Sequence, residues 1–235
     1  MPITDCGYAI GHDVFNPAEV EMMRTSIDDT INRIARGFLT PFATSCPGLP
    51  LEERLERVAH KDRAYAYALL HGVFADAQHD PRLSGLALHP VLMERVRQFL
   101  APKEVAGAII RVRVNIPSFP QKRSPWHQDV TGQNDLRVKG RTVGMACWIP
   151  LVDATESNGT LEVLPGMYEK PYPHEQTADG AFYIREDTLP TRPPVALPCP
   201  AGDVVFLDRF IPHHTLPNRT STIRWNVVMW VKCRV

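Results

Sequence analysis

The sequence predicts a mainly β protein, a jelly roll or barrel, with a layer of helices on its N-terminal side. Three features support this prediction. Helical patterns dominate residues 1–104, short β-rich runs follow from about residue 105, and proline- and glycine-rich turns separate these runs. A parallel α/β sheet would instead need crossover helices between its strands. With 235 residues, the chain is expected to form a single domain, 1–235, with its β core over 105–235.

The N-terminal layer is expected to contain three helices. Asn16 is a typical N-cap for a helix over 17–36, where apolar residues recur at every third or fourth position. Residues 59–77 and 90–100 carry the second and third helical patterns. These amphipathic segments would cover the outside of the β core.

The first strand of the core is predicted from the alternation of side chains in 109–114. One face holds Ile110, Val112 and Val114, and the other holds Arg111, Arg113 and Asn115. The two arginines either enter a pocket as anion-binding groups or are solvated strand residues. Further strands are expected over 142–149, 160–164, 181–184, 195–199, 203–207 and 223–231.

Charge and cysteine content limit the class of partner. Lys+Arg and Asp+Glu both total 26, and this balance argues against a nucleic-acid or anionic-membrane partner. The N-terminus carries acid where a signal peptide carries base, and no apolar run reaches membrane-spanning length, so we expect a cytoplasmic protein that acts on a small molecule. The five cysteines lack C-x-x-C spacing and are expected to be reduced thiols. No feature of the sequence specifies the oligomeric state.

The most informative motif is His127-Gln128-Asp129, taken together with His213 and Arg224 downstream. Two imidazoles and one carboxylate form the facial triad that holds non-haem Fe(II) and leaves coordination positions open. An arginine can bind the carboxylate of a co-substrate through two parallel hydrogen bonds. The order of elements is consistent with His213 and Arg224 lying on adjacent antiparallel strands that point into one cavity.

Further motifs extend this pattern through the second half of the chain. They are Trp-His-Gln-Asp at 126–129, Trp-Ile-Pro-Leu at 148–151, Asn-Gly-Thr-Leu at 158–161, Leu-Pro-Gly at 164–166, Gly-Asp-Val-Val-Phe at 202–206 and the stretch from His213 to Arg224. In this order and spacing, residues 105–233 resemble the phytanoyl-CoA dioxygenase-like branch of the Fe(II)/2-oxoglutarate oxygenases. The resemblance implies a double-stranded β-helix (jelly roll) core.

The resemblance also implies the iron ligands, which are the catalytic residues: His127, Asp129 and His213. His213 and His214 compete for the distal position, and the spacing to Asn218 and Arg224 favours His213. His214 would then point to the opposite side of its strand.

A co-substrate site is implied beside the iron. Arg224 would bind the far carboxylate of 2-oxoglutarate, with the hydroxyl of Thr215 beside it and the indole of Trp148 lining the pocket. Gln128, between two ligands, is expected to contact the co-substrate or the substrate. Loops over 116–125 and 167–197, together with the region 40–66, are expected to cover the iron.

The implied activity is Fe(II)-, 2-oxoglutarate- and O2-dependent hydroxylation of an unactivated C–H bond in a small metabolite, with release of succinate and CO2, in biosynthesis or catabolism. A carboxylate at position 129 argues against halogenation, which needs that coordination position for chloride. Desaturation, ring formation and epimerisation use the same cofactors and remain alternatives. Two other classes are a non-catalytic jelly-roll binding protein and a cupin-like dioxygenase that needs no 2-oxoglutarate.

Overall fold

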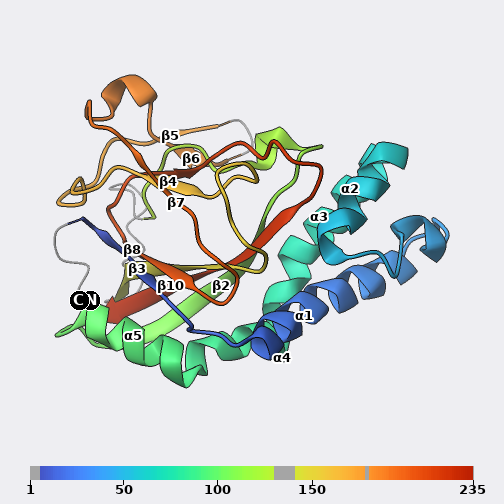
Figure 1. Cartoon of the computed structure of the whole chain (residues 1–235), viewed down its shortest axis with the longest axis horizontal. Helices are drawn as coiled ribbons and strands as arrows, with labels where there is room; N and C mark the ends of the chain where they lie inside the picture. The colour runs from blue at the N-terminus through green and yellow to red at the C-terminus, as the bar shows by residue number, and fades with distance from the viewer. Residues whose placement is uncertain (1–5, 130–140, 178–179, 235) are drawn as a thin grey trace.

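The computed structural model describes residues 6–129, 141–177 and 180–234. Two antiparallel sheets face each other, and helices cover the outer face of the larger sheet (Figure 1). The strands are β1 Tyr8–Gly11, β2 Val105–Asn115, β3 Arg141–Pro150, β4 Leu161–Val163, β5 Glu175–Gln176, β6 Phe182–Tyr183, β7 Val195–Leu197, β8 Val204–Asp208, β9 His213–Thr215 and β10 Arg224–Arg234. This arrangement confirms the predicted jelly roll.

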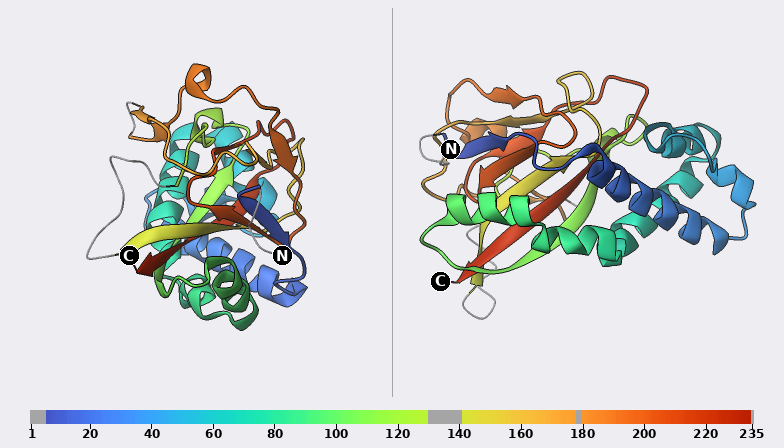
Figure 2. Two further views of the ribbon diagram at one scale, coloured as in Figure 1. Left: turned by 90° about the vertical axis from the view of Figure 1, so that its left-hand side faces the viewer. Right: turned by 60° about the horizontal axis from the view of Figure 1, so that its bottom comes forward.

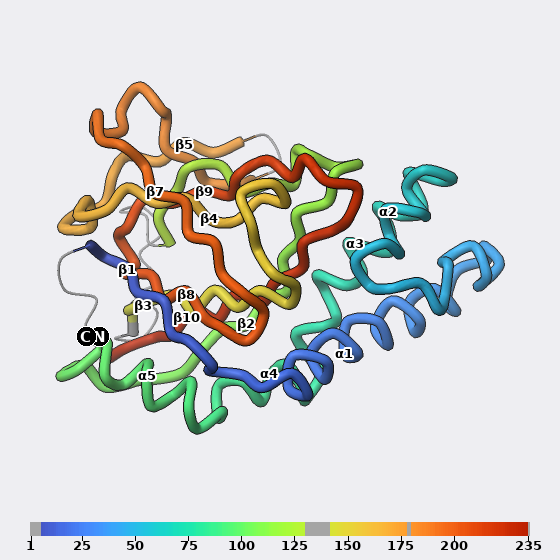
Figure 3. The backbone as a smooth tube through the Cα atoms, viewed as in Figure 1, coloured from blue at the N-terminus to red at the C-terminus, as the bar shows by residue number. Residues whose placement is uncertain are grey.

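The larger sheet has the strand order β1-β8-β3-β10-β2, and the smaller sheet has the order β7-β4-β9. Strands β5 and β6 form a separate two-stranded ribbon. Figure 3 shows β1, at the N-terminal end of the chain, running beside β8 from its C-terminal part. All strand pairs are antiparallel, so residues far apart in the sequence meet across the sandwich.

The helices are α1 Pro17–Arg36, α2 Leu51–Lys61, α3 Arg63–Asp76, α4 Pro81–Ser84 and α5 Pro90–Leu100. The predicted helices over 17–36 and 90–100 are confirmed. Asn16 caps α1 in a capping box, because its side chain accepts from the Glu19 N–H at 3.0 Å while Glu19 accepts from the Asn16 N–H at 2.8 Å. No described helix is long and apolar enough to cross a membrane.

The single helix predicted over 59–77 is wrong. The chain breaks at Asp62, whose backbone is extended (φ −145°, ψ 96°) and whose carboxylate accepts from the Tyr65 N–H at 2.9 Å to cap the following helix. Two helices, α2 and α3, therefore replace one. The apolar periodicity did not indicate this break, because apolar residues continue on both sides of it.

The region 40–66 also differs from the expectation that it covers the iron. It belongs to the helical layer, where the guanidinium of the fully buried Arg54 binds Asp28 at 2.6 Å and the Ser45 carbonyl at 2.8 Å. The Leu51 carbonyl accepts from the Trp225 indole N–H at 3.1 Å, which ties α2 to the outer face of the large sheet. The buried arginine holds this segment to α1.

The two faces of the large sheet differ in chemistry. On β10, Trp225, Val227 and Met229 pack against the helical layer, while Val228 and Trp230 pack toward the small sheet. The alternation predicted for β2 is confirmed, since its apolar side chains join the helix-facing core. Figure 2 shows the helices on one side of this sheet and the small sheet on the other. The face that looks toward the small sheet is the one that carries polar residues.

The predicted strands are confirmed except at their ends, whereas β1, β5 and β9 were not separately predicted. One consequence is a correction to the expected placement of His213 and Arg224. His213 lies on β9 in the small sheet, and Arg224 lies on β10 in the large sheet. The two residues therefore lie in different sheets and are not on adjacent strands.

Candidate metal centre

Two backbone hydrogen bonds bring His127 and His213 together. The His127 N–H donates to the His213 carbonyl at 3.0 Å, and the His213 N–H donates to the His127 carbonyl at 2.9 Å. The imidazole centroids are 4.3 Å apart. A loop segment after β2 is thereby fastened to β9, so two residues 86 positions apart present their rings to the same space.

The hydrogen bonds of the two rings leave the same atom of each available. His127 Nδ1 lies 2.8 Å from the Pro125 carbonyl, and His213 Nδ1 lies 2.9 Å from the Ile211 carbonyl. A carbonyl only accepts, so each Nδ1 carries the proton and each Nε2 keeps its lone pair for a metal. Burial, and then the neighbouring His213, hold the pKa of His127 well below its usual value. The neutral ring that a metal requires is therefore the favoured form.

Asp129 supplies the carboxylate. Its Oδ1 accepts from the Trp230 indole N–H at 2.6 Å, and its Oδ2 is buried and has no hydrogen-bond partner among the described residues. That oxygen lies 4.0 Å from His213 Nε2. Leaving a buried carboxylate oxygen unpaired costs more than about 1–3 kcal/mol, and a cation bound to this oxygen would remove that cost.

Together, His127, Asp129 and His213 offer one ligand atom each, and these atoms all lie within 4.8 Å of one another. Two imidazoles and one carboxylate on one side of a shared point leave the opposite side open, as a non-haem Fe(II) centre requires. The residues therefore fit the predicted metal.

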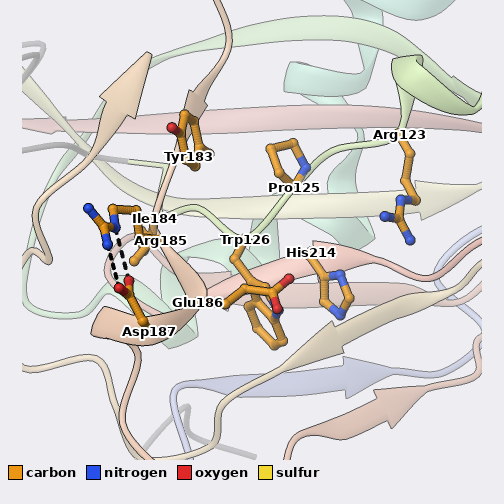
Figure 4. A pocket seen from close by; sticks show the side chains of 9 residues that line it. All are labelled: Arg123, Pro125, Trp126, Tyr183, Ile184, Arg185, Glu186, Asp187 and His214. Atoms are coloured by element: carbon orange, nitrogen blue, oxygen red, sulfur yellow. Dashed lines mark hydrogen bonds and ion pairs between the residues drawn. The ribbon is translucent and has the colours of Figure 1, made fainter. Parts of the chain in front are cut away.

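His214 points away from this centre. Its Nε2 lies 2.7 Å from Glu162 Oε2, and its ring stacks on Trp126 with centroids 4.0 Å apart. Both rings line a separate surface pocket of about 420 Å³ on the outer side of β9, whose rim carries Arg123 and the Arg185–Asp187 ion pair (Figure 4). The alternation of β9 therefore separates the two adjacent histidines, as predicted.

Arg224 is buried on the polar face of the large sheet. Its Nε donates to the Gly159 carbonyl at 3.0 Å, its Nη1 donates to Asn226 Oδ1, and its guanidinium lies 5.1 Å from the centre of the Trp148 ring. Burial lowers the pKa of Arg224 to about 9, and within the described ranges no carboxylate pairs with it. Thr215 is buried on β9, on the same face as His213.

Gln128 has partners other than those expected. Its side-chain amide donates to the carbonyls of Lys170 and Phe210 and accepts from the Tyr172 N–H at 2.7 Å. Its backbone N–H donates to His174 Nε2 at 3.0 Å. With both amide hydrogens used, Gln128 ties the 170–174 segment to the metal centre, and these contacts give no support to a role in binding the co-substrate.

Trp230 is a site residue that the sequence reasoning missed. Its position six residues after Arg224 on the same strand places both side chains on the polar face, and that signal was available from alternation alone. His174 was also missed, because it lies in an irregular segment where no periodicity predicts its direction.

A jelly roll with two histidines and a carboxylate around one point defines the class of non-haem iron oxygenases. The family described as phytanoyl-CoA dioxygenase (PhyH) matches residues 4–225, and the chain belongs to this family. The peroxisomal phytanoyl-CoA dioxygenase of Mus musculus is 26% identical over 157 residues, which is 63% of this chain and 45% of that protein. The match thus spans less than half the length of this relative.

Solved structures share the fold over 99% of this chain. EvdO2 from Micromonospora carbonacea var. aurantiaca, complexed with 2-oxoglutarate, is 24% identical, with 88% of that chain covered and a TM-score of 0.56. The 2-oxoglutarate-dependent epimerase SnoN from nogalamycin biosynthesis is 15% identical, with 78% covered and a TM-score of 0.58. The non-haem monooxygenase ThoJ is 19% identical, with 75% covered and a TM-score of 0.55. At these identities the likeness shows the fold.

Proposed function

We propose that this protein is an Fe(II)- and 2-oxoglutarate-dependent dioxygenase that hydroxylates an unactivated C–H bond of a small metabolite. His127, Asp129 and His213 would hold the iron. The observation that carries the proposal is the buried Asp129 Oδ2, which lacks a partner in the described chain and lies 4.0 Å from Nε2 of His213. Fe(II), when bound, supplies oxidising chemistry coupled to the conversion of 2-oxoglutarate and O2 to succinate and CO2.

Arg224 would anchor the far carboxylate of 2-oxoglutarate. A buried guanidinium that retains free N–H groups and has no carboxylate partner in the described ranges is suited to a charge-assisted, two-point contact. Trp148 stacks near the guanidinium and limits access of water to it. Thr215, buried opposite, is proposed to donate its hydroxyl to the same co-substrate.

Hydroxylation is proposed over halogenation because Asp129 would occupy the coordination position that a halide needs. Solved proteins of the same fold are described as an epimerase, a carbocyclase and a monooxygenase, so the product must be identified directly. A product that gains one oxygen atom supports hydroxylation. Loss of two hydrogen atoms indicates desaturation or ring formation, and an unchanged mass indicates epimerisation.

Adding Fe(II) and 2-oxoglutarate without oxygen tests the core of the proposal. We expect the weak visible charge-transfer band of the chelate, followed by succinate formation on aeration. The matched variants are His213→Ala and His214→Ala, which remove adjacent residues on opposite faces of β9. The first should lose the band and the second should retain it; absence of the band in the wild-type protein would overturn the assignment.

The anchor is tested with Arg224→Lys, which keeps the charge and removes the forked geometry. We expect the KM for 2-oxoglutarate to rise by roughly 10- to 100-fold, the range set by loss of a charge-assisted contact. Arg192→Lys, an exposed arginine that donates to the Pro165 carbonyl, is the control. An unchanged KM in Arg224→Lys would show that Arg224 does not bind the far carboxylate of 2-oxoglutarate.

A further inference from the structure

Two arginines on the polar face of the large sheet belong neither to the metal centre nor to the proposed 2-oxoglutarate anchor. Arg111 and Arg113 lie two residues apart on β2, so their side chains leave the strand on the same side. They pair in register with Val228 and Asn226 of β10. This is the face that also carries Trp230, so the arginines and the metal centre share one surface of the sheet.

Arg113 extends to the immediate surroundings of the proposed ligands. Its guanidinium lies 5.5 Å from the centre of the Trp230 ring, and the indole N–H of Trp230 donates to Asp129 at 2.6 Å. One indole ring therefore separates the guanidinium from the carboxylate. Arg113 is an exposed residue although protein atoms surround much of its guanidinium, so part of its side chain is accessible to a dissolved ligand.

The charges around Arg113 favour an incoming anion. Burial of the guanidinium end lowers the pKa of Arg113, and the nearby charge of Arg111 lowers it further, whereas Asp129 raises it. Arg111 uses Nη1 to donate to the Ile110 carbonyl at 2.8 Å and keeps its other N–H groups. Among the described residues neither arginine forms an ion pair, and Asp129 is committed to Trp230 and to the metal position.

We infer that Arg113, assisted by Arg111, binds an anionic group of the substrate, a carboxylate or a phosphate. The inference rests on the proposed function and specifies its substrate class as an acid. Guanidinium groups bind both anions through paired, charge-assisted hydrogen bonds. Two adjacent guanidinium groups that have no carboxylate partner are stabilised when one anion binds to both.

Arg224 and Arg113 differ in their depth of burial on this face, and this difference indicates which ligand each of them would bind. Arg224 is only 2% exposed and is held by the Gly159 carbonyl and Asn226, which suits a co-substrate that is the same in every turnover. Arg113 is an exposed residue, and within the described ranges its guanidinium contacts an aromatic ring and forms no ion pair, which suits a substrate that enters and leaves.

Titration of the Zn(II)-loaded protein with inorganic phosphate and, separately, with acetate tests the inference in the presence of saturating 2-oxoglutarate. Zn(II) keeps the site diamagnetic and inactive, so the indole N–H signals of the four tryptophans can be followed by NMR. Trp230→Phe identifies the Trp230 signal. We expect one or both anions to shift this signal saturably, and the anion with the higher affinity indicates whether the site prefers a carboxylate or a phosphate.

The variant that tests the site is Arg113→Gln, and we expect it to weaken anion binding by roughly tenfold or more, with a smaller loss in Arg111→Gln. Arg63→Gln is the matched control, because Arg63 is also exposed and lies 4.5 Å from the centre of an aromatic ring, that of Phe119 in the segment after β2. Unchanged signals from the other tryptophans establish that the Arg113→Gln protein is folded.

Three outcomes would overturn the inference: no saturable shift, equal affinity in wild type and Arg113→Gln, or release of 2-oxoglutarate by the added anion, which would locate binding at Arg224. None of these depends on turnover. Failure of the proposed function would appear separately, as absence of 2-oxoglutarate-dependent succinate formation by the iron-loaded wild-type protein.

Discussion

The two faces of the five-stranded sheet are built from the same strands and have opposite characters. Along β10, Trp225, Val227 and Met229 are completely buried against the helical layer. Arg224 and Asn226 alternate with these residues and point to the other side of the sheet. Both are polar, yet they are nearly as buried as the apolar residues. One face therefore contributes apolar burial, and the other holds groups that are costly to bury without partners.

This difference shows where stability and chemistry reside. Among the described residues, the buried atoms without a partner include Asp129 Oδ2 and Asn226 Nδ2 on the side of the small sheet, and also Tyr65 Oη in the helical layer. Unsatisfied polar atoms destabilise a metal-free protein, so the helix-facing core must compensate for them. Substitutions on one face should accordingly change activity, and substitutions on the other should change stability.

The largest expected effect on the polar face comes from Asp129→Ala. Removal of a ligand should lower succinate formation by more than about a thousandfold, because loss of only an outer-shell partner already costs roughly 10- to 100-fold. Unfolding of the metal-free variant by denaturant should change little, since loss of the orphaned oxygen offsets loss of the acceptor for Trp230. Retention of wild-type turnover would remove Asp129 from the site.

On the apolar face, Phe206→Ala should have the opposite signature. Phe206 is completely buried, with its ring 4.6 Å from that of Phe99, so its truncation should lower the free energy of unfolding by about 3–5 kcal/mol. Turnover per folded molecule should be retained at low temperature. Leu39→Ala, at a fully exposed position, is the control and should stay within about 0.5 kcal/mol of wild type. Equal effects of the two variants would contradict the contrast.

A smaller effect is expected from Trp230→Phe, which keeps a smaller aromatic ring and removes the N–H that holds Asp129 Oδ1. We expect Fe(II) affinity, measured by anaerobic titration, to fall by roughly 10- to 100-fold, because the carboxylate loses the donor that orients it. Trp126→Phe, whose ring stacks on His214 outside the centre, should leave affinity unchanged. Comparable losses in both variants would indicate a general packing effect.

The smallest effect lies in the helical layer, at Asp80. Hydrogen bonds from Arg82 hold the pKa of Asp80 at about 2, below its ordinary 3.8. The native pKa is depressed, so the ionised form stabilises the fold above about pH 4, and this contribution is lost as pH falls toward 2.

The free energy of unfolding of Asp80→Asn should therefore be lower than that of wild type by about 1–2 kcal/mol at neutral pH, and the gap should close on acidification. Asn retains the oxygen that caps Arg82. Asp187→Asn, which breaks the exposed pair with Arg185, is the control and should show a much smaller change. A gap that persists at pH 2 would assign the effect to packing.

The sequence predicted the elements that have a clear periodicity and the site residues that have a distinctive chemistry. The capping residue and apolar spacing of α1 gave its bounds, and alternation along β2 assigned both of its faces. The ligand trio was predicted from its residue types together with the family resemblance, and the structure brings all three together. The break at Asp62 was not predicted, because a single capping carboxylate within a continuous apolar pattern leaves the periodicity unchanged.

Contacts between remote segments were less accessible. Gln128 was expected to contact a ligand, yet its amide binds backbone groups of Lys170, Tyr172 and Phe210, because a buried amide requires partners wherever the fold supplies them. The sheet assignment of β9 was missed for a related reason. A three-residue strand has too little pattern to indicate which neighbour it pairs with.

The hydrogen bond between Trp230 and Asp129 has a consequence for how the two halves of the sandwich stay together. His213 belongs to the small sheet, whereas Asp129 is held by an indole of the large sheet. An ion shared by both ligands would therefore join the two layers, and its binding energy would add to the energy that resists their separation. Chelation should then lower the melting temperature of the protein, and replenishing Fe(II) should raise it again with the logarithm of the free concentration of the ion.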